Sequence, residues 1–335
     1  MSTRTRDELK LLQNLPLEIK VAKTKLRIRE WVNYYGTDGV YVSFSGGKDS
    51  TVLLHIVREM YPDIEAVFVN TGLEYPEIQQ FVKTFDNVTI LRPKMRFDEV
   101  IKKYGYPIIS KEASRKIEYA RKGSQWAIKY AQDETSRYGI KRYEPLLHCD
   151  FLISNRCCDV MKKSVAKKYG KVSGKVAITG STAEESKMRT QSWLRHGCNA
   201  FDGKTPISNP MSFWTEQDIL QYIKQNNIKI ASVYGDVVYD KEPEQLRLCD
   251  VGEKLTTSGC ERTGCIFCGF GCHLDKEPSR FQMLKETHPK QYEYCIGGGE
   301  FNEQGIWQPS KEGLGMGYVF DRLNEIYGDG FIKYK

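Results

Sequence analysis

The sequence contains no apolar run that approaches the roughly 18 residues needed to cross a bilayer. Residues 1–8 lack the apolar core of a signal peptide, so we expect a cytoplasmic protein without a membrane partner. Internal repeats and low-complexity segments are also missing. The excess of positive charge is small: a net charge of +7 in 335 residues suits an anionic ligand but is weak evidence for nucleic acid.

The chain has ten cysteines, which we expect to be reduced because the cytosol disfavours structural disulfides. A C-x2-C turn aims two thiolates at one metal, and flanking glycines let amide N–H groups approach the sulfurs. Two groups fit this chemistry: Cys157 and Cys158, and Cys260, Cys265, Cys268 and Cys272. They predict an iron–sulfur or zinc site, and spacing alone does not decide between these. Three isolated thiols are interpreted as core residues: Cys149, Cys198 and Cys249.

A glycine pair stands between a predicted strand and a predicted helix. Residues 40–44 form a β-branched and aromatic run, and residues 51–60 are apolar at helical spacing. Backbone N–H groups of the first helical turn face an anion in such an arrangement, and a lysine and two serines add donors. The spacing differs from a Walker loop and resembles the PP-loop of ATP pyrophosphatases. The predicted phosphate-binding residues are Ser45, Gly46, Gly47, Lys48, Asp49 and Ser50.

Three further strands are predicted at residues 66–70, 88–91 and 175–180. Their alternation with helices predicts an α/β fold with a doubly wound parallel sheet, whose ligands lie at the carboxyl ends of the strands. A small Cys-rich metal-binding module follows. The predicted division is a helical segment (1–36), a PP-loop nucleotide-binding domain (37–234) and the Cys-rich module (235–335).

Two segments of the nucleotide-binding domain have a distinct character. Residues 111–147 are rich in charge and tyrosine; they are interpreted as a helical insertion that forms a lid, a contact surface for an acidic acceptor, or a solvated helix pair. An amphipathic helix is predicted from residue 215 onward, with Thr215 as its N-cap and Trp214 in the core.

Five motifs occur in a fixed order between about residues 38 and 275: the Ser45–Ser50 loop, residues 70–77, the Cys157-Cys158 pair, residues 178–189, and residues 209–219. This succession resembles the phosphoadenosine phosphosulfate (PAPS) reductase family of adenine nucleotide α-hydrolases. The resemblance implies that residues approaching the nucleotide are Asn70, Thr71, Gly72 and Gly180. It implies that Arg189 contacts the α-phosphate or leaving group, against the alternative of a surface ion pair with Glu185. It also implies a [4Fe–4S] cluster, with zinc as the alternative, on Cys158, Cys260, Cys265 and Cys268.

Two departures limit this resemblance. Reductases of this family usually have a degenerate phosphate loop, whereas this loop is complete and suits pyrophosphate release from ATP. They also end in a Glu-Cys-Gly-Leu-His motif with a catalytic cysteine, which this sequence does not contain. By its position alone, Cys295 is the candidate for that catalytic cysteine. A nucleophilic cysteine needs a depressed pKa, and the alternative interpretation of Cys295 is a buried structural thiol.

These observations predict an enzyme that uses ATP with Mg²⁺ to adenylylate an acceptor, with Lys48, Asp49 and Arg189 at the reacting phosphates. The cluster then supports sulfur transfer from an external donor, as in enzymes that thiolate tRNA or DNA. The alternative is an adenylyl-sulfate or PAPS reductase that releases sulfite, with Cys295 as nucleophile and an external thiol as electron donor. A second alternative is a non-catalytic nucleotide sensor with structural zinc. The oligomeric state is left open.

Overall fold

The computed structural model describes residues 4–133, 139–202, 205–240 and 254–335. Packing divides the chain into two units, each assembled from three stretches of sequence. The first unit comprises residues 1–70, 74–91 and 166–263, and the second comprises residues 71–73, 92–165 and 264–335. These boundaries differ from the three segments predicted above, whose status as domains stays a prediction. Cys249 lies outside the described residues.

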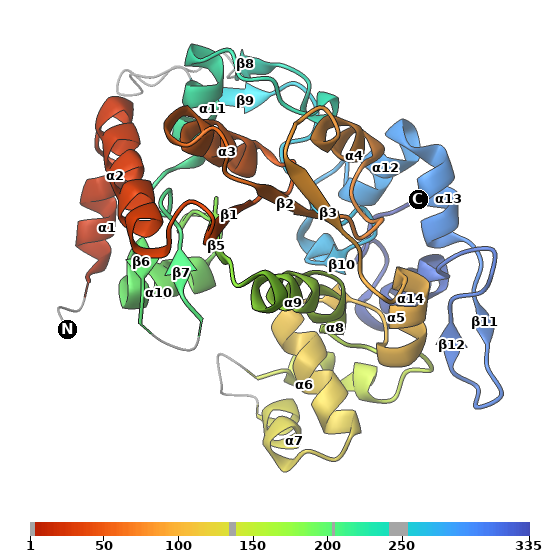
Figure 1. The fold of residues 1–335 in the computed structure, drawn as a ribbon. Helices are drawn as coiled ribbons and strands as arrows, with labels where there is room; N and C mark the ends of the chain where they lie inside the picture. Colours follow the sequence, from red (N-terminus) through yellow and green to blue (C-terminus); the bar gives the residue numbers. More distant parts are fainter. Residues whose placement is uncertain (1–3, 134–138, 203–204, 241–253) are drawn as a thin grey trace, which may run out of the picture. The chain divides into compact units, whose positions relative to one another are not determined.

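The first unit contains a parallel four-stranded sheet in the order β3-β2-β1-β5 (Figure 1). Its strands are β1 (Val40–Ser43), β2 (Ala66–Val69), β3 (Val88–Leu91) and β5 (Val176–Thr179), which confirms the four predicted strands. The strand order runs outward from β1 through β2 to β3, and then returns to the other side of β1. The gap between the carboxyl ends of β1 and β5 is therefore the point where α/β sheets bind ligands.

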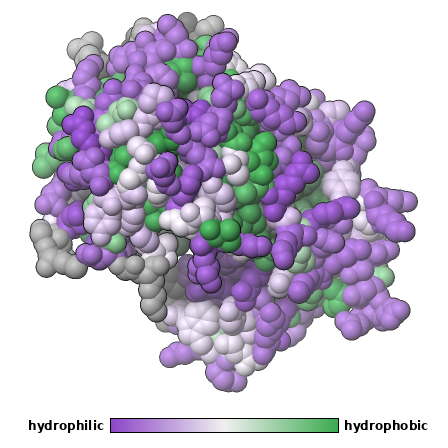
Figure 2. All heavy atoms as spheres, in the orientation of Figure 1, coloured by the Kyte–Doolittle hydropathy of each residue, from purple (hydrophilic) through white to green (hydrophobic). Residues whose placement is uncertain are grey.

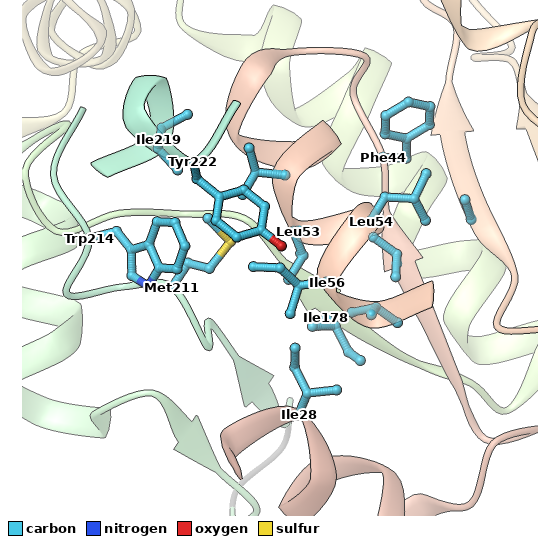
Figure 3. Packing of buried hydrophobic residues seen from close by; sticks show 14 of the residues in the cluster. Ile28, Phe44, Leu53, Leu54, Ile56, Ile178, Met211, Trp214, Ile219 and Tyr222 are labelled. Carbon is cyan, nitrogen blue, oxygen red and sulfur yellow. The ribbon is translucent and has the colours of Figure 1, made fainter. Parts of the chain in front are cut away.

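Helices pack on this sheet through an almost fully apolar core. Helix α3 packs on β1, α2 and α11, and its Val52, Leu53 and Ile56 are inaccessible to solvent. Figure 3 shows residues of α2, α3, β5 and α11 converging in this cluster, together with Trp214, as predicted. The helices of this unit are α1 (Arg6–Gln13), α2 (Leu17–Tyr35), α3 (Lys48–Met60), α4 (Pro76–Val82), most of α9 (Ser164–Ser173), α10 (Lys187–His196) and α11 (Glu216–Gln225). Its short hairpins pair β6 (Asn199–Ala200) with β7 (Ile207–Ser208) and β8 (Val237–Tyr239) with β9 (Leu255–Thr257).

A buried ion pair ties α2 to the start of α11. Lys20 Nζ lies 2.7 and 2.6 Å from the two carboxylate oxygens of Asp218 and donates to the carbonyl of Gln13 at 2.6 Å. The Lys20 side chain is only 2% exposed. Asp218 also accepts from the backbone N–H of Thr215, whose hydroxyl caps the helix as predicted. One carboxylate thus neutralises a buried cation and closes a capping box.

The second unit is mainly helical. The described part of residues 111–147 contains helices α6 (Lys111–Arg121) and α7 (Gln125–Gln132) and a 3-10 turn (Lys141–Leu147). That this segment is an insertion or a lid stays a prediction. A short parallel pair joins β4 (Ile108–Ile109) to β10 (Gly269–Phe270). The other elements are α5 (Phe97–Tyr104), α8 (Arg156–Cys158), α12 (Arg280–Thr287), α13 (Pro289–Ile296), β11 (Glu300–Phe301), β12 (Trp307–Gln308) and α14 (Met316–Tyr327).

The surface is predominantly hydrophilic on the face drawn in Figure 2, where hydrophobic residues appear as patches among polar ones. Among the described residues, no helix is both long and apolar enough to cross a membrane.

Candidate functional site

A cavity of about 350 Å³ in the first unit lies at the carboxyl ends of β1 and β5. It is the position that the strand order marks for a ligand. The phosphate loop forms one wall, and residues 179–182 after β5 form another. The charged residues that line it are Lys48, Asp49, Glu184, Glu185, Arg189, Glu216, Glu261 and Arg262.

The loop itself is held by glycine geometry and by serine hydroxyls. Gly46 has a φ of +73°, and a Cβ there would lie 2.8 Å from Ile78 and 2.9 Å from Val82, so only glycine fits. The Ser50 hydroxyl accepts from the backbone N–H of Ser45 at 3.1 Å and donates to the carbonyl of Gly47 at 2.9 Å. Helix α3 begins at the next residue, and the N–H groups of its first turn have no partner within the helix.

Lys48 is buried at the start of α3, with its side chain 5% exposed. Its ammonium donates to the carbonyl of Glu261 at 2.8 Å and to Glu216 Oε1 at 3.1 Å, and lies 5.4 Å from the ring centroid of Tyr234. These contacts fix the cation at the cavity wall. A fixed cation beside the N-terminus of a helix is suited to a phosphate group.

Gly180 approaches the phosphate loop closely. A Cβ at this position would lie 3.0 Å from the carbonyl oxygen of Asp49 and 3.3 Å from Cα of Ser50. The sequence predicted that this glycine makes room for the nucleotide. The structure shows that it makes room for the backbone of α3, while it still lines the cavity.

Carboxylates are more numerous in the cavity than the sequence analysis anticipated. Glu184 accepts from the backbone N–H of Glu216 at 2.6 Å, and Glu185 forms an ion pair with Arg189. Arg189 lines the cavity and forms the ion pair with Glu185 that the alternative interpretation described, while its contact with the α-phosphate or leaving group stays a prediction. The only sequence signal for these carboxylates was their place directly after β5.

Burial raises the pKa of Asp49 above its ordinary value, and the nearby Glu185 raises it further. The folded state therefore holds a proton on Asp49 more tightly than the unfolded chain does. Stability is then lost as pH rises through this range, and the loss is complete above the raised pKa. We expect Asp49→Asn to melt at a higher temperature than the wild type near pH 7, and the difference to vanish in acid. Melting curves between pH 4 and 8 check this; equal midpoints throughout would contradict it.

The three residues assigned to adenosine are not brought together at this cavity. Asn70 donates to the side chain of Gln79 at 3.2 Å and is not among the described residues that line the cavity. Thr71 and Gly72 belong to the second unit. Their contact with adenosine stays a prediction.

Four cysteines come together within the second unit. Cys157 and Cys158 share a hydrogen bond, which raises the pKa of Cys157 and lowers that of Cys158. The neighbouring Cys265 and Cys268 raise the pKa of Cys157 as well. Among the described residues, no group of three or more Cys, His, Asp or Glu is already set in metal-binding geometry. The donor chemistry nevertheless fits a cluster, because four neighbouring thiols of one unit can supply a Cys₄ set of ligands.

Local backbone structure positions both cysteine pairs. Cys157 and Cys158 end α8, and a π-helical turn, Asp159–Lys163, follows directly; such turns occur frequently at functional sites. The second pair is closed by a turn in which the N–H of Cys268 donates to the carbonyl of Cys265 at 3.0 Å. Gly269 follows, and a Cβ there would lie 2.7 Å from the carbonyl of Pro107.

Cys260 and Cys272 have other contacts. Cys260 belongs to the first unit, where its thiol donates to the carbonyl of Arg262 at 2.9 Å and has Lys48 and Glu261 as its charged neighbours. Cys272 is buried and donates to the carbonyl of Gly269 at 3.0 Å, and burial raises its pKa to about 12. Within the second unit, Cys157 has Cys158, Cys265 and Cys268 as neighbours and so becomes a further candidate ligand, while Cys260 as a ligand stays a prediction.

Cys295 is completely buried in α13. Its thiol lies 3.5 Å from the sulfur of Met316, and burial raises its pKa well above the ordinary value. A nucleophilic cysteine requires the opposite shift and access to substrate. The structure supports the alternative interpretation of Cys295, that of a structural thiol.

The family model of the phosphoadenosine phosphosulfate reductase domain matches residues 39–123 and 97–269. The chain belongs to the PAPS reductase family. The match includes the phosphate loop, both cysteine pairs and residues 179–189, so the family resemblance inferred from the motifs is confirmed.

Relatives of this family member carry different names. It is 26% identical over 222 residues to a phosphoadenosine 5′-phosphosulfate reductase of Xylella fastidiosa, covering 66% of this chain and 76% of that one. It is 24% identical over 214 residues to an adenosine 5′-phosphosulfate reductase of Staphylococcus haemolyticus, covering 63% and 72%. An uncharacterised protein of Methanocaldococcus jannaschii is 25% identical over 258 residues, which are 76% of this chain but only 46% of that protein. The chain therefore spans about half the length of this archaeal relative.

A solved PAPS reductase from Candida auris covers 68% of this chain and 90% of its own, with 14% identity and a TM-score of 0.38. The parallel sheet with its packed helices makes the first unit an α/β fold.

Proposed function

We propose that this PAPS reductase family member is an ATP pyrophosphatase that adenylylates an acceptor for iron–sulfur-dependent sulfur transfer. The observation that carries this proposal is the complete phosphate loop. Its Lys48 ammonium is buried and fixed at a cavity, and this cavity lies where the strand order of the sheet reverses. A full set of loop donors suits the three charged groups of ATP better than the sulfate of a sulfonucleotide.

In the proposed reaction an acceptor oxygen attacks the α-phosphorus of ATP, and the bond to the β-phosphate oxygen breaks. Pyrophosphate leaves with the electron pair of that bond, while the acceptor becomes adenylylated and releases a proton to solvent. Lys48 and the N–H groups of the first turn of α3 offset the charge that develops on the leaving group. Arg189, which lines the same cavity, offsets charge at the α-phosphate. Mg²⁺ enters with ATP as part of the substrate.

The four cysteines of the second unit are the ligands that we propose for a [4Fe–4S] cluster: Cys157, Cys158, Cys265 and Cys268. Such a cluster would supply a site at which sulfur is bound before transfer. Lys111 and Lys162 lie close enough to lower the pKa of Cys158, so the surroundings of this one cysteine favour its thiolate.

Iron content separates this ligand set from the one predicted by the sequence. After anaerobic purification we expect about four irons per chain in the wild type and in Cys260→Ser, and less than about one in Cys157→Ser. Serine keeps the size of the side chain but lacks the thiolate. Loss of iron in Cys260→Ser with retention in Cys157→Ser would restore the sequence-based set, and zinc in place of iron in the wild type would contradict the cluster.

A nucleic acid is the acceptor class that we propose, on the basis of a surface formed by α6 and α7. Trp126 is 45% exposed and Tyr119 is 38% exposed, and their ring centroids are 6.3 Å apart. The guanidinium of Arg115 lies 5.3 Å from the Trp126 ring, and that of Arg156 lies 5.9 Å from the Tyr119 ring. Exposed aromatic rings with interleaved cations suit unpaired bases and their phosphates.

The test is a pyrophosphate assay on anaerobically purified protein, with ATP alone and with tRNA or single-stranded DNA added. We expect release of pyrophosphate that rises when the acceptor nucleic acid is present. Release of sulfite from adenylyl sulfate or PAPS, without consumption of ATP, would support a reductase instead. A zinc-loaded protein that consumes neither nucleotide would be a sensor.

A further inference from the structure

A second cavity in the first unit is separate from the phosphate loop and has no role in the proposed reaction. It has a volume of about 170 Å³ and lies between α2, the C-terminal end of α10 and the start of β6. Arg4, Lys23 and Arg27 contribute to its wall. The other lining residues are Leu12, Trp193, Gly197, Cys198, Asn199 and Phe213.

The charge of this wall has one sign. Arg4, Lys23 and Arg27 are cations, and no carboxylate occurs among the described residues that line the cavity. Arg27 has a counterion outside the lining, since its guanidinium lies 2.8 Å from Glu30. The cavity thus differs from the phosphate-loop cavity, where five carboxylates accompany three cations. Converging cations without lining counterions attract an anion.

Trp193 supplies a buried donor at the same place. The residue is 4% exposed. Its indole N–H interacts with the Cys198 sulfur, which lowers the pKa of that thiol, and makes no hydrogen bond to a nitrogen or oxygen among the described residues. Sulfur is a weak acceptor, so an oxygen acceptor bound in the cavity would compete for this N–H.

The guanidinium of Arg4 lies against Gly197. This glycine ends α10 with a φ of +68°, and a Cβ there would lie 2.7 Å from Cζ of Arg4. The absence of a side chain at position 197 therefore gives the guanidinium room at the cavity wall.

We propose that this cavity binds a tetrahedral oxyanion, a phosphate or sulfate group, between Arg4, Lys23 and the indole N–H of Trp193. Several charge-assisted hydrogen bonds to one group match such an anion, which accepts in all directions. The group is either a free ion or the terminal phosphate of a nucleotide. The proposal goes beyond the proposed function and does not depend on it.

The experiment is calorimetric titration of the full chain with inorganic phosphate, sulfate and adenosine monophosphate. Because the phosphate loop also binds phosphate, the titrations use a Lys48→Ala background. In that background we expect one site per chain. Lys23→Gln should weaken it about tenfold, and Trp193→Phe, which keeps a ring but loses the N–H, several-fold. The matched control is Lys25→Gln, on the same helix, whose ammonium pairs with Glu59 at 2.9 Å and does not line the cavity.

The outcomes are distinct. If phosphate or sulfate binds and adenosine monophosphate does not, the ligand is a free ion. If adenosine monophosphate competes with the inorganic anion, the ligand is a nucleotide phosphate. Both results support the site. Equal affinities in Lys23→Gln and Lys25→Gln, or no binding at millimolar concentrations, would overturn it. Because binding is read without turnover, the result stands whether or not the protein releases pyrophosphate.

Discussion

Replacement of Lys48 by alanine is expected to lower the rate of pyrophosphate release from ATP by roughly two to three orders of magnitude, the range seen when one fixed donor to a developing oxyanion is removed. The ammonium is buried and held by Glu261 and Glu216, so it needs no reorganisation when charge builds on the leaving group. The four cysteines proposed as cluster ligands belong to the second unit. Iron content is therefore expected to stay unchanged in the variant.

Lys25→Gln is the control for the Lys48 variant, because it removes a cation that pairs with α3 on the outside of the same unit. Initial rates of pyrophosphate release, iron content and melting curves are measured on all three proteins. A Lys48→Ala protein that is folded, loaded with iron and as fast as the wild type would exclude the proposed reaction. Loss of release together with loss of folding would be uninformative, and Lys48→Met, which keeps the buried stem, then replaces it.

Breaking the pair between Lys20 and Asp218 is expected to have the largest effect on stability. Removing one member of a buried ion pair typically costs about 3–5 kcal/mol, because the other charge stays buried without its partner. The effect should be asymmetric. In Lys20→Met, Asp218 keeps the N–H and hydroxyl of Thr215 as donors. Asp218→Ala instead leaves the Lys20 ammonium with only one described acceptor, the Gln13 carbonyl, and removes the side-chain half of the capping box.

Urea unfolding of Lys20→Met, Asp218→Leu and the double variant that combines these two changes measures this coupling. We expect the double variant to recover a large part of the loss, since apolar replacements of buried pairs are often neutral. If each single change costs less than about 1 kcal/mol, the pair is solvated in solution and this account of it is wrong.

The strands and the phosphate loop were predictable because their signals are local. Each of the four strands is a short apolar run, as expected for strands buried in a parallel sheet, and each lies within a residue or two of its prediction. The glycine of the loop that requires a positive φ, Gly46, was visible from its place between strand and helix. The division into two units was not predictable in this way, because it depends on packing between distant stretches of sequence.

The candidate site shows the same contrast. Lys48 and Arg189 were found from their motifs, whereas the role of Glu216 was missed because it reaches the cavity from the start of α11. Among the cysteines, the family resemblance implied Cys260 as a ligand, and this stays a prediction. That Cys157 has Cys265 and Cys268 as neighbours was not predictable, because it depends on packing between distant stretches of sequence.

The sheet order also governs how this protein can be made. Strand β1 needs β5 on one side, and Val40 pairs with Val176, more than a hundred residues later in the chain. At translation speeds of about 5–20 residues per second, β5 is synthesised roughly ten seconds or more after β1, and that edge of β1 is unpaired until then. Over this interval a nascent chain exposes an apolar strand edge, the kind of surface that templates aggregation. Slower growth at low temperature with abundant chaperones should therefore raise the soluble yield, and no N-terminal fragment ending before β5 should fold.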